Sequence, residues 1–303
     1  MPIIEANNIK LAYDVRGEPD AEPVLLIAGL GLQLTSWPDA FCETLVEQGF
    51  RVIRFDNRDT GLSSRMEQYG KPNLHTAFFK SLFHMPLLGG YTLYDMARDA
   101  ICLLDALGVA RAHVVGASMG GMIAQLMAAR YPERVITLTS IMSTSGRPGL
   151  PGPSFAANQA MFSRPANPRD PNSVIDHYVR LFQVIGSPAY PTPEPELRRR
   201  VRESVRRGAS FSGTARQMMA VATTGDLVPQ LRTIRLPALV IHGTHDPLVP
   251  IACGRDSARN IAGAVLHEVE GMGHDIPPQL EQDLARVIAG HCRREWPAEA
   301  QRA

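Results

Sequence analysis

The sequence predicts an α/β fold in which a mostly parallel central sheet has helices on both faces and carries an inserted helical cap. Short, mostly apolar runs alternate with helical segments along most of the chain. This alternation is typical of parallel strands that are buried on both faces. Several runs end in glycine-rich or acidic turns, and one long stretch in the second half of the chain lacks the alternation.

The elements follow one another in a regular order. Two strands are expected at Ile3–Asn7 and Ile9–Arg16, and this pair would form the antiparallel edge of the sheet. Buried strands are expected at Val24–Ala28, Val52–Phe55, Ala112–Val115, Val135–Ile141, Ala238–Ile241 and Val265–Val269. Helices are expected at Trp37–Gln48, Leu93–Leu107, Met119–Tyr131, Ile251–Ala262 and Gln279–Cys292.

Two segments interrupt this order. Residues 62–92 lengthen the connection after Asp56, and residues 143–236 contain Pro-rich turns and helical pieces around 172–185 and 196–222. A connection of this length inside a compact domain is typical of a lid over a site. The expected organisation is a core of residues 1–142 and 237–303, a cap of residues 143–236, and a long loop at 62–92 near the site.

Composition excludes several classes of protein. The 303 residues are 45% hydrophobic and 20% charged with a net charge of +1, so neither nucleic acid nor an anionic membrane surface is an expected partner. The arginine-rich stretch 198–207 is interleaved with Val201 and Val205, which predicts the solvent-facing side of a helix. No apolar run approaches the roughly 18 residues of a membrane span.

The N-terminus and the cysteines indicate a cellular compartment. Met1–Glu5 lacks the basic and apolar regions of a signal peptide, so we expect a cytoplasmic protein. The cysteines are widely spaced and form no CxxC pair, which favours neither a zinc site nor a disulfide framework. They are Cys42, Cys102, Cys253 and Cys292.

One short motif carries the chemistry. Residues Gly116–Gly120 spell G-x-S-x-G between a predicted strand and a predicted helix, which is the setting of a nucleophilic serine on a sharp elbow. Glycine at 116 and 120 lets the tight turn close. A helix that begins directly after the turn points free N–H groups at a developing anion. The pattern predicts Ser118 as a nucleophile.

A serine hydroxyl needs a general base, and the base needs a carboxylate that fixes its tautomer. In the expected order of serine, acid and histidine, Asp246 follows the strand ending at Ile241, and His274 follows the strand ending at Val269. The carboxyl ends of parallel strands meet at one edge of a sheet. The sequence therefore predicts a catalytic triad of Ser118, Asp246 and His274.

Two features of the sequence next to the predicted acid and base are interpreted without a catalytic or metal-binding role. His242 and His245 have a His-x-x-His spacing, but no cluster of further ligands accompanies them, so no metal is expected. Asp275 adjoins His274, and adjacency makes it an awkward partner for that ring. We interpret Asp275 as a residue at the start of a helix, before a Pro-Pro pair.

Acyl transfer also needs two backbone N–H donors for the oxyanion. We expect one from Met119, directly after the nucleophile, and the other from Leu30, which is flanked by glycines after the first buried strand. Apolar side chains of the cap and the long loop would bind the substrate, and methionine suits irregular shapes. We therefore expect an ester or lactone of modest size with an apolar portion. The expected substrate-binding residues are Phe83, Met161, Phe162 and Met218.

These residues resemble the α/β-hydrolase superfamily over nearly the whole chain, and the similar branches are enol-lactone hydrolases, small carboxylesterases and aclacinomycin methylesterase-like enzymes. The resemblance implies a cofactor-free serine hydrolase that cleaves a carboxylic ester or lactone through an acyl-enzyme at Ser118. A serine at the elbow argues against the dehalogenase and epoxide-hydrolase branches, which use an aspartate. The supporting segments are Gly29–Gly31, Asp56–Ser63, Tyr91–Ala97, Gly116–Gly121, His242–Pro250 and Gly271–His274.

Other functions fit parts of the same pattern. A non-catalytic receptor could keep this fold and bind a small ligand, and the same triad supports perhydrolase or C–C bond hydrolase chemistry. A dinucleotide enzyme would use Gly29–Gly31 and Asp56. However, Leu34 takes the position of the third glycine, and the next helix begins only near Trp37. No helix N-terminus would then meet a pyrophosphate, so no cofactor is expected.

Overall fold

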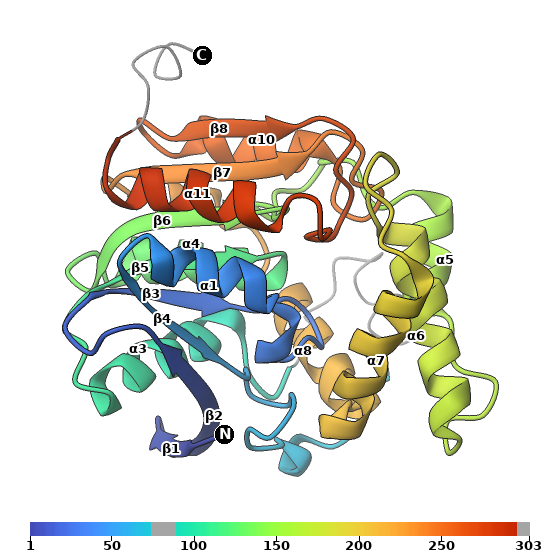
Figure 1. Ribbon diagram of the computed structural model, residues 1–303. Helices are drawn as coiled ribbons and strands as arrows, with labels where there is room; N and C mark the ends of the chain where they lie inside the picture. The colour runs from blue at the N-terminus through green and yellow to red at the C-terminus, as the bar shows by residue number, and fades with distance from the viewer. Residues whose placement is uncertain (74–88, 296–303) are drawn as a thin grey trace.

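The computed structural model describes residues 1–73 and 89–295, and these contain an eight-stranded sheet in the order β1-β2-β4-β3-β5-β6-β7-β8 (Figure 1). Strands β1, β2 and β4 pair antiparallel, and all the other neighbours pair parallel. This confirms the predicted parallel sheet with an antiparallel edge. The strands are β1 (Ile3–Ala6), β2 (Ile9–Arg16), β3 (Glu22–Ile27), β4 (Phe50–Phe55), β5 (Ala112–Ala117), β6 (Val135–Ile141), β7 (Ala238–Gly243) and β8 (Val265–Val269).

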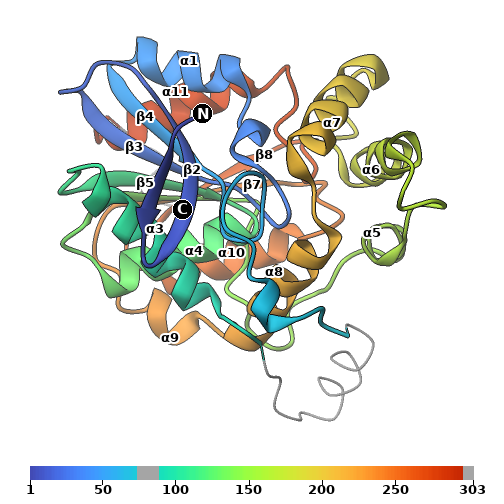
Figure 2. The ribbon, with the colours of Figure 1, turned by 90° about the horizontal axis from the view of Figure 1, so that it is seen from below.

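Helices cover both faces of the sheet, with α1 and α11 on one face and α3, α4 and α10 on the other (Figure 2). Along β3, Val24 and Leu26 pack toward the α1–α11 side, and Leu25 and Ile27 pack toward the α3–α4 side. Because both faces are covered, the strand is continuously apolar. The covering helices are α1 (Asp39–Glu47), α3 (Leu93–Ala106), α4 (Met119–Arg130), α10 (Ile251–Asn260) and α11 (Glu281–Cys292).

Two helix starts differ from the predicted ones. The helix expected from Trp37 begins at Asp39 because Pro38 occupies its N-cap, and a short 3-10 turn at Leu34–Ser36 precedes it. The last helix begins at Glu281, after a turn in which the Leu280 amide donates to the Pro277 carbonyl.

Between β6 and β7 the chain forms further helices, and several of these gather beside one end of the sheet (Figure 1). The helical piece expected at 196–222 is two helices. Gly208 has φ +128°, and Ser210 caps the second helix by accepting a hydrogen bond from the Gly213 amide. The helices of this segment are α5 (Phe155–Phe162), α6 (Pro171–Ile185), α7 (Glu194–Gly208), α8 (Phe211–Thr224) and α9 (Val228–Leu231).

The arginines of α7 do not all face solvent, so that prediction was wrong in part. Arg207 donates to Asp56, whose side chain is fully buried after β4, over 2.6 Å. Arg200 pairs with Glu281 of α11 over 2.8 Å. Helix α7 presents arginine on more than one side, and one of these sides meets the loops at the end of the sheet. These ion pairs attach α7 to the rest of the molecule.

The long loop is described at its two ends only. Residues 62–73 include a 3-10 turn at Glu67–Tyr69, and Phe83 lies outside the described residues. The four cysteines carry free thiols. Within the described part of the chain, no helix combines the length and the apolar character needed to cross a bilayer.

Candidate active site

Ser118 stands on a sharp turn between β5 and α4. Its backbone has φ +55° and ψ −121°, a conformation that a residue other than glycine rarely adopts and that functional sites concentrate. The turn brings backbones very close together. A Cβ at Gly116 would overlap the carbonyl of Gly120, and a Cβ at Gly120 would overlap the carbonyl of Ile27. Only glycine fits at these two positions, so the motif is a requirement of the elbow.

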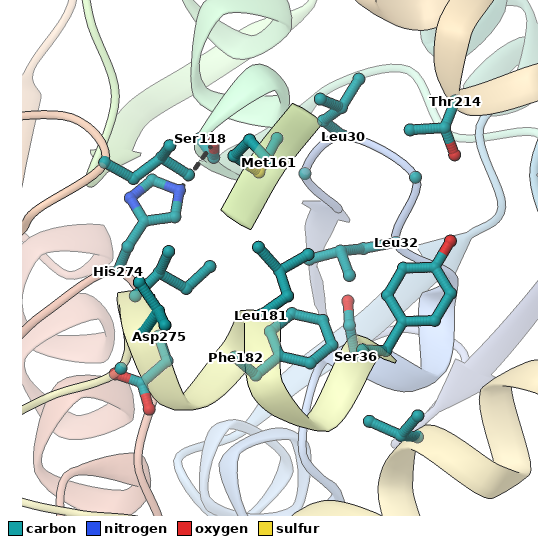
Figure 3. Close-up of a pocket in the computed structure, with 18 of the residues that line it drawn as sticks. Leu30, Leu32, Ser36, Ser118, Met161, Leu181, Phe182, Thr214, His274 and Asp275 are labelled. Carbon is teal, nitrogen blue, oxygen red and sulfur yellow. Dashed lines mark hydrogen bonds between the residues drawn. The ribbon is translucent and has the colours of Figure 1, made fainter. Parts of the chain in front are cut away.

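The side chains of Ser118, His274 and Asp246 form one hydrogen-bonded chain. The His274 Nε2 atom lies 3.0 Å from the Ser118 Oγ atom, and Figure 3 shows this contact. The His274 Nδ1 atom lies 2.7 Å from Asp246 Oδ2. All three residues lie just past the carboxyl ends of β5, β7 and β8. The structure thus brings the three sequence-predicted residues together in the predicted order.

Backbone contacts fix the acid and the histidine. Asp246 Oδ1 accepts the amides of Leu248 and Val249 over 2.9 and 2.8 Å, which leaves Oδ2 for the imidazole. The His274 amide donates to the carbonyl of Ile185 in α6 over 2.7 Å. Because each carboxylate oxygen has its own partners, Asp246 holds His274 in the tautomer with the proton on Nδ1. The Nε2 lone pair then faces Ser118.

A second histidine lies behind the acid. His242 is fully buried, and its Nε2 atom donates to the Val249 carbonyl over 2.7 Å and lies 3.6 Å from Asp246 Oδ2. Burial lowers the pKa of His242 below its usual value, so the ring is neutral at pH 7. His245 is exposed and contacts Thr244. Among residues 1–73 and 89–295, no three His, Cys, Asp or Glu side chains form a metal-binding group.

Asp275 does not start a helix, so that interpretation was wrong. Its Oδ1 atom accepts a hydrogen bond from the Ser187 hydroxyl over 2.5 Å, and Ser187 in turn accepts the Gly273 amide over 2.9 Å. Burial raises the pKa of the Asp275 carboxyl above its usual value. The loop between β8 and α11 is held against the end of α6, and this contact overrides the helix-start preference of Asp-x-Pro-Pro.

The two predicted oxyanion donors lie beside Ser118. Met119 is the first residue of α4, and Leu30 lies on the loop after β3. A Cβ at Gly29 would lie 3.3 Å from the Ser118 Cβ, so this loop passes directly along the serine. In the described parts of the chain neither the Leu30 nor the Met119 amide donates to a protein acceptor. Two N–H groups without a partner beside a nucleophile are what an oxyanion site requires.

A large cavity opens over Ser118 between the sheet edge and helices α5–α8. Its volume is about 1460 Å³, and both Ser118 and His274 line it. Met161 of α5 and Met218 of α8 line the same cavity. Phe162 lines it as well, but 56% of this side chain is exposed. Of the four expected substrate-binding residues, Phe83 alone lies outside the described part of the chain.

Gln217 is a further residue near the site that was not among the predicted site residues. This residue of α8 is fully buried and contacts the loop that carries Leu30. In the sequence, Gln217 is a polar residue among the small and apolar residues of one helix face. Such a pattern indicates a buried polar side chain that has hydrogen-bond partners. The partner of such a group is not visible in the sequence, because Gly31 lies 186 positions away.

Comparisons with known proteins agree with this geometry. A profile described as the alpha/beta hydrolase fold matches residues 22–278. Rhodomycin D methylesterase DnrP of Streptomyces peucetius is 32% identical over 310 residues, which cover 96% of this chain and 97% of that enzyme. The enol-lactonase structure from Burkholderia xenovorans LB400 has a TM-score of 0.74 and 26% identity, covering 96% of this chain and 100% of that one.

A further relative comes from another branch. A putative carbamate hydrolase RutD of Variovorax paradoxus is 30% identical over 267 residues, which cover 87% of this chain and 89% of that protein. The family profile spans most of the chain, and relatives at 30% identity or more cover 87–96% of it. These findings confirm both the family resemblance and the predicted fold. The chain therefore belongs to the alpha/beta hydrolase fold family.

Proposed function

We propose that the protein is a serine hydrolase that cleaves a carboxylic ester or lactone through an acyl-enzyme at Ser118. The single observation that carries this proposal is the unbroken chain from Ser118 Oγ through the His274 ring to Asp246. The Leu30 and Met119 amides, which have no acceptor among the described residues, support it further. Named relatives include a methylesterase and enol-lactonases, which act on these two kinds of bond.

The proposed reaction has two halves. His274 Nε2 takes the Ser118 proton as Oγ attacks the carbonyl carbon, and the Leu30 and Met119 amides stabilise the oxyanion. His274 then gives that proton to the leaving alkoxide, so an alcohol departs and an acyl-serine remains. In the second half water loses a proton to His274 and attacks the acyl carbon. The carboxylic acid leaves as the proton returns to Ser118.

The cavity supports a substrate larger than the modest ester expected from the sequence. Its volume of about 1460 Å³ exceeds the roughly 300–1,000 Å³ of ordinary small-molecule sites. Apolar side chains such as Leu32, Leu181 and Phe182 form part of its wall (Figure 3). We therefore propose an ester or lactone with a bulky, largely apolar portion. Rhodomycin D methylesterase is, by its name, a relative that acts on a methyl ester.

The test is turnover of p-nitrophenyl esters of rising acyl length together with a set of lactones. We expect hydrolysis by the wild-type protein and a loss of at least about 10⁴-fold in kcat for Ser118→Ala. Ser257→Ala is the matched control, because Ser257 is a fully buried serine of α10 whose hydroxyl bonds only the Cys253 carbonyl among the described residues. It should keep its activity.

Each other function predicts a different result in this assay. A non-catalytic receptor would turn over no member of the panel and would bind ligands equally well with or without Ser118. A C–C hydrolase would ignore esters and cleave a vinylogous diketone. A perhydrolase would need hydrogen peroxide as the acyl acceptor. Turnover of esters that persists in Ser118→Ala would refute the proposal itself.

A further inference from the structure

The loop that carries Leu30 is held at several points. Within it, the Leu32 amide donates to the Gly29 carbonyl over 3.2 Å and closes a turn. The Gly29 carbonyl and the Leu30 N–H belong to the same planar peptide unit, so a change in that turn re-aims the Leu30 N–H. Gly31 lies inside the turn with φ +67°, a conformation that glycine adopts without strain. The backbone conformation of Gly31 is therefore coupled, through this turn, to the direction of the Leu30 N–H.

Gln217 of α8 is the partner of Gly31. Its Oε1 atom accepts the Gly31 amide over 2.8 Å. Its Nε2 atom donates to the Arg58 carbonyl and to the Thr60 hydroxyl, each over 2.7 Å. One side chain thus joins the loop after β3 to the loop after β4. In Figure 3 the loop with Leu30 passes between Ser118 and Thr214, which lies one turn before Gln217 on the same helix.

The chemistry of these partners fixes which way the amide of Gln217 points. A flipped amide would set its NH₂ group against the Gly31 N–H and its oxygen against the Arg58 carbonyl. The side chain is fully buried, so no water can replace a lost partner without a rearrangement. The three hydrogen bonds use both hydrogens and one lone pair. A group satisfied in this way holds its neighbours in a single arrangement.

We propose that Gln217 is a positioning residue for the oxyanion site, which acts through the Gly31 amide to aim the Leu30 N–H at the substrate carbonyl. This inference rests on the proposed function, because it assigns Leu30 as an oxyanion donor. It also gives α8 a role beyond lining the cavity. The helix inserted between β6 and β7 completes the catalytic geometry of the core, so the two parts work as one unit.

The decisive variant is Gln217→Met, which keeps the length of the side chain and removes all three hydrogen bonds. Losing one oxyanion donor outright lowers kcat about 10²–10³-fold. A misdirected donor retains part of its effect, so we expect kcat for p-nitrophenyl esters to fall about 10- to 100-fold. KM should change less than about threefold, because the oxyanion contact forms mainly in the transition state.

A second readout separates positioning from general stability. A trifluoromethyl ketone adds to the serine and forms a tetrahedral oxyanion, so its Ki should rise by the same factor as kcat falls. Gln125→Met is the matched control, because Gln125 is a fully buried glutamine of α4 whose amide donates to Ser140 and, among the described residues, forms no hydrogen bond with the loop. We expect this control to keep its kcat and its Ki.

The conservative variant Gln217→Glu tests the hydrogen bonds themselves. No cationic group is among the hydrogen-bond partners that Gln217 has in the described part of the chain, so burial keeps a carboxyl group at this position protonated, and it then accepts from Gly31 and donates to the Arg58 carbonyl as the amide does. Its kcat should lie within about fivefold of the wild-type value. This variant also provides the test if Gln217→Met does not fold, because a loss as large as an absent oxyanion donor would contradict the proposal.

Two results overturn the inference. One is a Gln217→Met protein that is less stable but keeps wild-type kcat and Ki. The other is an equal loss in Gln217→Met and Gln125→Met, which would indicate a general effect of a buried methionine. Both can be distinguished from failure of the proposed function. If the proposed function fails, the wild-type protein itself will show no ester hydrolysis that depends on Ser118.

Discussion

The substitution Asp246→Asn isolates the role of the acid with very little change of shape. Asp246 Oδ1 accepts the amides of Leu248 and Val249, so the oxygen of the new amide must take this place. Its NH₂ group then faces His274 Nδ1, where Oδ2 now lies at 2.7 Å. Two N–H donors cannot share that position. The ring therefore keeps its proton on Nε2, and Ser118 loses its proton acceptor.

The size of the effect follows from these contacts. Restoring the active tautomer would place two buried N–H donors opposite each other, which costs about 2 kcal/mol. The imidazolium formed during the reaction would also lose its charged partner in a buried site, which costs about 3 kcal/mol more. Together these costs raise the barrier by about 5 kcal/mol, or about 10⁴-fold in kcat. Thermal stability should change little, because both backbone hydrogen bonds to the side chain remain.

The assay is steady-state hydrolysis of one p-nitrophenyl ester near pH 7.5, with thermal unfolding of the same samples. We expect kcat to fall about 10⁴-fold and KM to stay within a few fold. A variant that keeps more than a tenth of the wild-type kcat would refute the reasoning. It would mean that Asp246 does not set the tautomer of His274.

Further predictions concern stability. Burial lowers the pKa of His291 to about 4 from its usual 6.5, so below pH 6.5 the unfolded chain binds a proton that the folded protein does not. The free energy of unfolding should therefore fall by about 3 kcal/mol between pH 6.5 and 4, and His291→Gln, which can still donate to the Leu138 carbonyl, should flatten this dependence in urea titrations. Removing the partner of the buried Asp56 by Arg207→Met should lower the free energy of unfolding by about 3 kcal/mol. The exposed neighbour Arg206 serves as the control, since Arg206→Met should change it by less than about 0.5 kcal/mol, and equal effects of the two substitutions would contradict the anchoring role of Arg207.

Sequence reasoning succeeded where local chemistry decides the structure. The run Val135–Ile141 is a strand with the predicted bounds, because a strand covered on both faces is mostly apolar and buried along its whole length. The glycines around Ser118 predict the elbow, because backbone segments approach each other there so closely that no larger residue fits. Asp246 and His274 could be placed together because parallel strands bring their carboxyl ends to one edge.

What the sequence could not predict depends on contacts between distant segments. Arg207 looks like any other arginine of α7, and only the fold places it on Asp56, 151 positions away. Gln217 has no motif, since its role depends on two loops that approach α8 from the opposite end of the chain. Asp275 has the pattern of a helix start, but Ser187 draws it into a different turn. The break between α7 and α8 rests on one residue, Gly208, inside a helical pattern.

The central claim is that His274 activates Ser118 as a nucleophile, and covalent labelling tests it most directly. A fluorophosphonate probe is allowed to react with the wild-type protein and with His274→Ala, and the modified peptide is then identified by mass spectrometry. We expect a single adduct on Ser118 and a labelling rate at least about 10³-fold lower in the variant. An adduct on another residue, or equal rates in the two proteins, would contradict the account.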